Sequence, residues 1–157
     1  MSGLVYMEFK GAGVTVYVND DVVKIWLSSR QISFSTHEAF GVLIASTSED
    51  RKEYWIESVT VPKPEDSSTR CSFILKDISH QLTVDKAFSD SEGQLIYLGT
   101  WHTHPQEKPV PSDIDKVDWK NCIKDNLDRR LFFVIVGTER VHIYTKGIFG
   151  FKALMPI

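Results

Sequence analysis

The stretch from Thr100 to Asp115 reads TWHTHPQEKPVPSDID and combines two histidines, a proline-bearing loop and a carboxylate. His102 and His104 are two residues apart, so in an extended chain both imidazoles project to the same side, about 6 to 7 Å apart in backbone rise. Asp115 follows after the loop. Two imidazoles and one carboxylate are the open three-ligand set of a catalytic zinc site, whose fourth position is left for water. The stretch therefore predicts a site for one Zn²⁺ ion in the chain.

Ser112 also has a purely structural interpretation. Ser-x-x-Asp after a proline-bearing loop is typical of a helix start, with Ser112 as the N-cap and Asp115 in the positively polarised first turn. A helix that begins there would direct Asp115 back toward the loop that carries the histidines. The structural and the chemical interpretation of this segment are compatible.

The same residues resemble the motif of the JAMM family, also called MPN+ metalloproteases. That motif is a distant Glu, then H-[ST]-H-P, seven residues counted from the proline, and S-x-x-D. HTHP at residues 102–105 and SDID at residues 112–115 match it without a gap. The distant glutamate falls on Glu38, in THEAFGVLIAS. The resemblance spans residues 38–115, and motif matches gain force when spacing and context agree in this way.

The resemblance implies a role for each of these residues. His102, His104 and Asp115 would bind zinc, and the ion would make a water molecule nucleophilic at neutral pH. Glu38 would take the proton of that water and later deliver it to the departing amine. The Ser112 hydroxyl would stabilise the oxyanion of the tetrahedral intermediate.

The family resemblance also implies a substrate class. JAMM enzymes commonly cut an amide or isopeptide bond after the C-terminal tail of ubiquitin or a ubiquitin-like protein. The compact chain looks most like short stand-alone bacterial members, some of which serve antiphage operons (CBASS-like). There they reverse a conjugation made by E1- or E2-like partner enzymes, sometimes onto a cyclic-nucleotide synthase. We therefore expect a ubiquitin-like protein or its conjugate as substrate.

Two other metalloenzyme classes are excluded by the residues, and two alternatives remain open. HEAFG at residues 37–41 begins like the zincin motif but has Gly41 where a second histidine must stand. A zinc nucleobase deaminase needs P-C-x-x-C, whereas Cys71 and Cys122 are far apart. A non-catalytic MPN scaffold would usually have lost the ligands that this chain retains. A sulfur-carrier-processing metal hydrolase would use the same site with a different pocket.

Composition is that of an ordinary globular enzyme. The chain has 157 residues, of which 42% are hydrophobic and 25% charged, which predicts a single domain over residues 1–157. The net charge of -3 provides no basic surface for nucleic acid. There is no secretion signal and no apolar run of 18 residues, so we expect a cytoplasmic protein that does not enter membranes.

Hydrophobic patterning predicts alternating strands and helices. We expect strands at residues 4–9, 14–18, 54–61, 71–75, 95–101, 131–136, 141–145 and 148–151. Residues 39–45 are a strand or a short helix, and helices follow Asn19 or Asp20, cover residues 78–88 and begin at Ser112. Interspersed elements of this kind predict an α/β fold, a mixed sheet flanked by helices. The resemblance implies the same architecture, the JAB/MPN fold, which is similar to that of cytidine deaminase.

Alternation along the strand at residues 95–101 places Ile96, Leu98, Thr100, His102 and His104 on one face, so both imidazoles should extend that face beyond the strand end. Trp101 either lines the site or packs in the core. His37, His80 and His142 lack a spaced ligand set, which favours ordinary structural or surface roles.

Overall fold

The computed structural model describes residues 7–33, 35–68, 73–74 and 76–157. Nine strands form one mixed sheet in the order β10-β9-β8-β7-β3-β4-β2-β1-β11. Their bounds are Met7–Gly11 (β1), Val14–Val18 (β2), Phe40–Thr47 (β3), Glu53–Val59 (β4), Ile96–Thr103 (β7), Phe132–Val136 (β8), Val141–Gly147 (β9), Gly150–Ala153 (β10) and Met155–Pro156 (β11). A separate small hairpin pairs Ser67–Ser68 (β5) with Phe73–Ile74 (β6).

The C-terminal segment nearly closes this sheet on itself. β10 pairs with β9 at one edge, and β11 pairs with β1 at the other. Between the two, the Leu154 amide donates to the Ile143 carbonyl, and the Leu154 side chain is buried. Covering both edges in this way leaves few unpaired backbone groups for unwanted association.

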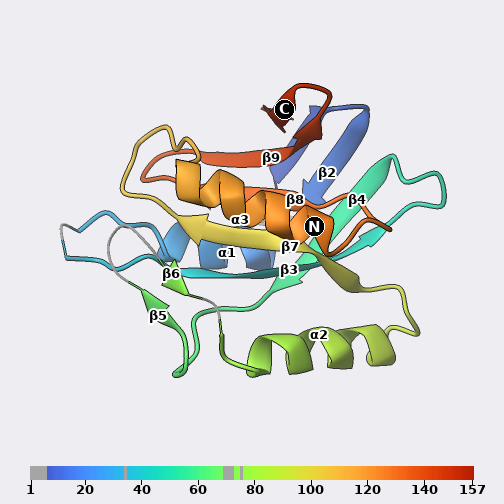
Figure 1. Ribbon diagram of the computed structural model, residues 1–157, viewed down its shortest axis with the longest axis horizontal. Helices are drawn as coiled ribbons and strands as arrows, with labels where there is room; N and C mark the ends of the chain where they lie inside the picture. The colour runs from blue at the N-terminus through green and yellow to red at the C-terminus, as the bar shows by residue number, and fades with distance from the viewer. Residues whose placement is uncertain (1–6, 34, 69–72, 75) are drawn as a thin grey trace.

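Within the described residues, three helices pack against the sheet: Asp20–Ser28 (α1), Ser79–Asp90 (α2) and Asp113–Lys124 (α3). Helices α1 and α3 pack on opposite faces of strand β8, because alternate residues of this strand belong to different cores. Phe132, Val134 and Val136 join the cluster that contains α1, whereas Phe133 and Ile135 pack with Trp119 of α3. β8 is thus buried on both faces, as its continuous apolar run predicted. Figure 1 shows α3 and α2 at opposite sides of β7.

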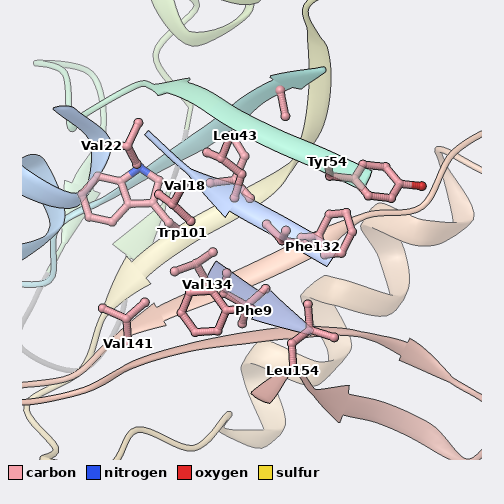
Figure 2. Close-up of a cluster of buried hydrophobic side chains, with 14 of the residues drawn as sticks. Phe9, Val18, Val22, Leu43, Tyr54, Trp101, Phe132, Val134, Val141 and Leu154 are labelled. Carbon is pink, nitrogen blue, oxygen red and sulfur yellow. The ribbon is translucent and has the colours of Figure 1, made fainter. Parts of the chain in front are cut away.

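Apolar side chains from opposite ends of the chain meet in the larger core (Figure 2). Val22 of α1 lies with Leu43, Trp101 and Val134 of the central strands, and Phe9 and Leu154 close the cluster at the other end. Asn19 caps α1 by accepting from the Asp21 amide, which confirms one of the two predicted caps. This core holds β3 and β7, the strands that carry the candidate site.

Most predicted elements are present, with shifts at their ends. Residues 39–45, predicted as a strand or a short helix, form strand β3, which pairs antiparallel with β4. The prediction for residues 148–151 is wrong at its start, because Ile148 and Phe149 form an exposed turn before β10. Parts of the predicted strands at residues 4–9 and 71–75 lie outside the described residues.

A bulge in β7 overturns part of the predicted alternation. Thr100 pairs with Val42, but Tyr97 already pairs with Ile44, so β7 contains one more residue than β3 over this stretch. Leu98 consequently faces the same core as Trp101, three residues later. The prediction that Leu98 shares a face with His102 is wrong.

Gly99 makes this bulge possible, and Gly99→Ala is expected to lower the free energy of unfolding by about 3 kcal/mol or more. Its φ of 130° is one that side-chain-bearing residues rarely adopt, and a Cβ there would lie 1.8 Å from the Phe132 carbonyl oxygen. Urea denaturation measures the loss. Gly147→Ala is the control, with a nearest contact of 3.3 Å and an expected cost below about 1 kcal/mol. Equal effects of the two substitutions would contradict this account of the bulge.

Candidate metal centre

The end of β7 and the start of α3 bring three predicted ligands together. The Nε2 atoms of His102 and His104 lie 3.0 Å apart. Asp115 completes the group, with Oδ1 3.3 Å from His102 Nε2 and Oδ2 3.3 Å from His104 Nε2. The prediction that both imidazoles project to one side is therefore confirmed.

This spacing suits a zinc ion. Ligand atoms that each lie about 2.0 to 2.1 Å from a tetrahedral ion are separated from one another by about 3.3 Å. The two imidazole nitrogens lie 3.0 Å apart, and each lies 3.3 Å from a different oxygen of Asp115, distances close to that value. The donor set of two imidazole nitrogens and a carboxylate is one that zinc favours. The residues present therefore fit the ion that the motif implies.

The histidines are held by the centre of the sheet. His102 is a buried residue of β7, flanked by Phe40 of β3 and Ile135 of β8. His104 lies just beyond the strand, where its amide donates to the carbonyl of Val136. Neighbouring strands on both sides thus set the direction in which the imidazoles point.

A capping box at the start of α3 positions the carboxylate. Ser112 is the N-cap, and its Oγ accepts from the Asp115 amide at 3.1 Å. Asp115 Oδ2 in turn accepts from the Ser112 amide at 2.8 Å. The predicted structural role of Ser112 is confirmed, and the cap turns Asp115 toward the histidines.

Burial and the interactions with neighbouring groups shift the pKa values of the histidines and of Asp115 in opposite directions. Burial lowers the pKa of His102, which favours the neutral imidazole that binds metals. Burial also disfavours a charged His104, but hydrogen bonding to Asp115 and the charges of Asp115 and Glu38 outweigh it and raise the pKa of His104. Burial likewise opposes ionisation of Asp115, but hydrogen bonds from both histidines hold its pKa far below the usual range. The Asp115 carboxylate is therefore ionised at neutral pH and can bind a cation together with the imidazoles.

Glu38 lies beside the ligands although it is 64 positions from His102 in the chain. A carboxylate oxygen of Glu38 and ring nitrogens of His102 and His104 all lie within 4.8 Å of one another. Glu38 is 3% exposed, and its Oε2 has no hydrogen-bond partner among the described residues. Burial raises the pKa of Glu38 to about 8, and the nearby charge of Asp115 adds to this, while His104 opposes it. A buried carboxyl of this kind is suited to exchanging a proton near neutral pH.

Backbone pairing with β7 fixes the segment that carries Glu38. The Thr103 amide donates to the Ala39 carbonyl, and the Ala39 amide donates to Thr103 Oγ1, both at 2.9 Å. The Thr103 hydroxyl donates to Gln31 Oε1 at 2.9 Å. These bonds join the residue after Glu38 to the residue between the two histidines.

Gln106 is a residue of the site that the sequence interpretation missed. Its Oε1 lies 3.3 Å from His104 Nδ1 and accepts from the Val110 amide at 3.2 Å. Its backbone carbonyl accepts from the Thr138 amide. An acceptor at Nδ1 places the ring proton there and leaves Nε2 with a lone pair directed at the centre. The only sequence signal was a polar residue two positions after His104.

Several neighbouring residues have structural roles. Trp101 is fully buried and its Nε1 donates to the Thr60 carbonyl, which confirms packing over substrate contact. His142 and the Tyr144 hydroxyl both contact the Pro109 carbonyl and hold the loop between the ligands. His80 is buried between Thr60 and Asp66, each 2.6 Å away.

Comparison with known proteins identifies a family model and relatives that match most of the chain. The family model described as prokaryotic homologs of the JAB domain matches residues 30–146. A protein of Vibrio cholerae named CD-NTase/cGAS isopeptidase is 36% identical over 125 residues, 79% of this chain and 77% of the relative. A protein of the same name from Escherichia coli is 36% identical over 132 residues, 83% and 81% of the two chains.

A solved structure shows the same fold at lower identity. The solution structure of a protein from Desulfitobacterium hafniense has a TM-score of 0.58 and 22% identity, and the match covers 87% of each chain. The names of the curated relatives support a hydrolase of the isopeptidase kind. None of the described helices is long and apolar enough to cross a membrane. By family model, relatives and fold, the chain belongs to the prokaryotic JAB-domain family.

Proposed function

We propose that this protein is a zinc-dependent isopeptidase that cleaves the bond at the C-terminal tail of a conjugated protein in a CD-NTase or cGAS system. The observation that carries the proposal is the convergence of His102, His104 and Asp115 beside the buried, unpartnered carboxylate oxygen of Glu38. The names of the curated relatives support the substrate class. A ubiquitin-like partner, E1- or E2-like enzymes encoded nearby and a cytoplasmic antiphage role belong to the same proposal.

Each residue has a part in the reaction. His102, His104 and Asp115 would hold the ion, which when bound would acidify a water molecule and polarise the scissile carbonyl. Glu38 Oε2 accepts a proton from the attacking water and delivers it to the departing amine nitrogen. Ser112 Oγ accepts from the Asp115 amide, and its hydroxyl hydrogen would be donated to the oxyanion.

Gln106→Ala is expected to weaken zinc affinity by about tenfold, because outer hydrogen-bond partners orient a metal-binding imidazole. Competition with a chromogenic chelator measures the zinc dissociation constant without any need for substrate. Gln94→Ala, at an exposed glutamine outside the site, is the matched control. Unchanged zinc affinity in Gln106→Ala would remove Gln106 from its positioning role.

The substrate class is tested with three purified conjugates. The first links the C-terminus of a CD-NTase to a lysine side chain, and the second links the C-terminus of a ubiquitin-like protein to a lysine side chain. The third is a sulfur-carrier protein with a C-terminal extension. We expect the zinc-loaded enzyme to release the CD-NTase with an intact C-terminus, as measured by mass spectrometry. Cleavage of the sulfur carrier alone would favour carrier processing, and no cleavage of any conjugate would contradict the isopeptidase proposal.

A further inference from the structure

The segment that carries Glu38 has no regular structure of its own. Helix α1 ends at Ser28 and β3 begins at Phe40, and the described residues between them form neither helix nor strand. Glu38 lies near the end of this connection and is buried beside the metal ligands. Because an irregular segment lacks the regular backbone pairing that fixes a strand, other contacts must position this carboxylate.

Gln31 is buried just after α1 and uses both ends of its side-chain amide. Its exposed fraction is 1%. Oε1 accepts from the Thr103 hydroxyl at 2.9 Å, and Nε2 donates to the Thr36 carbonyl at 3.0 Å. A side-chain amide can supply an acceptor and a donor at the same time. Gln31 thereby joins the segment just before Glu38 to the residue between the two histidines.

Gln31 is itself attached to a packed part of the molecule. The preceding residue, Arg30, donates from Nε to the Leu27 carbonyl at 2.8 Å and from Nη1 to the Thr138 carbonyl at 3.3 Å. Trp26, in the last turn of α1, is fully buried in the larger core. The position of Gln31 is therefore set by the end of α1 and not by the irregular segment that it contacts.

Thr103 continues the contact to the other side of Glu38. Its Oγ1 accepts from the Ala39 amide, and the same hydroxyl donates to Gln31. The Thr103 amide also donates to the Ala39 carbonyl, and the side chain is fully buried. Glu38 thus lies between two attached points, Thr36 before it and Ala39 after it. Gln31 contacts the first point directly and the second through Thr103.

We propose that Gln31 is a positioning residue that places Glu38 for proton transfer, acting through Thr36 on one side and through Thr103 on the other. A catalytic group must be held within about 0.5 Å of its productive position, and a misplacement of about 1 Å can lower a rate about a hundredfold. This inference rests on the proposed function for the reaction that Glu38 performs. Attachment of the segment is nevertheless measurable without any substrate.

The first measurement is hydrogen exchange of single backbone amides in the purified protein, followed by NMR. Gln31→Met keeps the length of the side chain but removes both hydrogen-bonding groups. We expect the Ala39 amide to exchange at least about tenfold faster in this variant, because the Thr103 hydroxyl loses its acceptor and the segment loosens. The Val42 amide also donates to a threonine hydroxyl, that of Thr60, and serves as the internal reference. Equal acceleration of the two amides, or none, would overturn the inference.

The second measurement compares conjugate cleavage with zinc binding. Thr103→Val removes the hydroxyl but keeps the shape of the side chain. We expect this variant and Gln31→Met each to lower kcat about thirtyfold, while KM and the zinc dissociation constant change less than about threefold. Thr103→Ser keeps the hydroxyl and should restore most of the rate. In a Glu38→Gln background, Gln31→Met should lower the residual rate less than about twofold, because no proton acceptor remains to be positioned.

Thr145→Val is the matched control for loss of a buried hydroxyl. Thr145 is fully buried, and its Oγ1 donates to the Leu131 carbonyl at 2.8 Å. This variant should be destabilised to a similar extent as Thr103→Val but should keep wild-type kcat. An equal loss of kcat in Thr145→Val, or a thirtyfold effect of Gln31→Met that persists in the Glu38→Gln background, would contradict positioning through Glu38. Selective acceleration of Ala39 exchange, without turnover of any conjugate by the wild type, would instead contradict only the isopeptidase proposal.

Discussion

Glu38→Gln is expected to lower the turnover number by about a thousandfold while zinc remains bound at one ion per chain. Glutamine keeps the size of the side chain but cannot accept the proton of the attacking water. The carboxyl is buried and its Oε2 is unpartnered within the described residues, so in the wild type this oxygen is available to accept the proton. Conjugate cleavage gives the rate, and elemental analysis gives the zinc content.

The matched control for this substitution is Glu49→Gln, at an exposed glutamate away from the site, which should keep wild-type activity. A purified Glu38→Gln enzyme that retains turnover would show that Glu38 is not the proton acceptor. Loss of zinc together with activity would instead make Glu38 a ligand, in keeping with its position within 4.8 Å of both imidazoles.

His104→Ala is expected to weaken zinc affinity by more than about a hundredfold and to reduce cleavage to background. The substitution removes an imidazole nitrogen that lies 3.0 Å from His102 Nε2 and 3.3 Å from Asp115 Oδ2. Chelator competition and conjugate cleavage measure the two effects. His37→Ala, at an exposed histidine, should change neither. Wild-type zinc affinity in His104→Ala would place the ion elsewhere.

The local part of the site could be predicted because short-range rules fix it. His102 and His104 follow strand alternation, and the Ser112 cap directs Asp115 back toward them. All three positions lie within 14 residues of chain, so spacing alone limits their geometry. Glu38 required the family motif, because only pairing between β3 and β7 brings it to the ligands.

The hydrophobic pattern of the sequence does not predict features that depend on tertiary contacts. The bulge at Gly99 reverses the alternation of side-chain directions along β7. The spacing of apolar residues in LIYLGT does not predict this bulge. Gln106 acts through a loop whose path depends on Thr138 and Pro109.

We expect His102, His104 and Asp115 to hold a zinc ion that the hydrolysis requires. The most direct test is titration of zinc into metal-free enzyme while cleavage of a CD-NTase isopeptide conjugate is measured. We expect no cleavage before zinc is added and full activity at one zinc per chain, with no recovery in His102→Ala. Full activity of the metal-free enzyme, or zinc-restored activity in His102→Ala, would contradict the account.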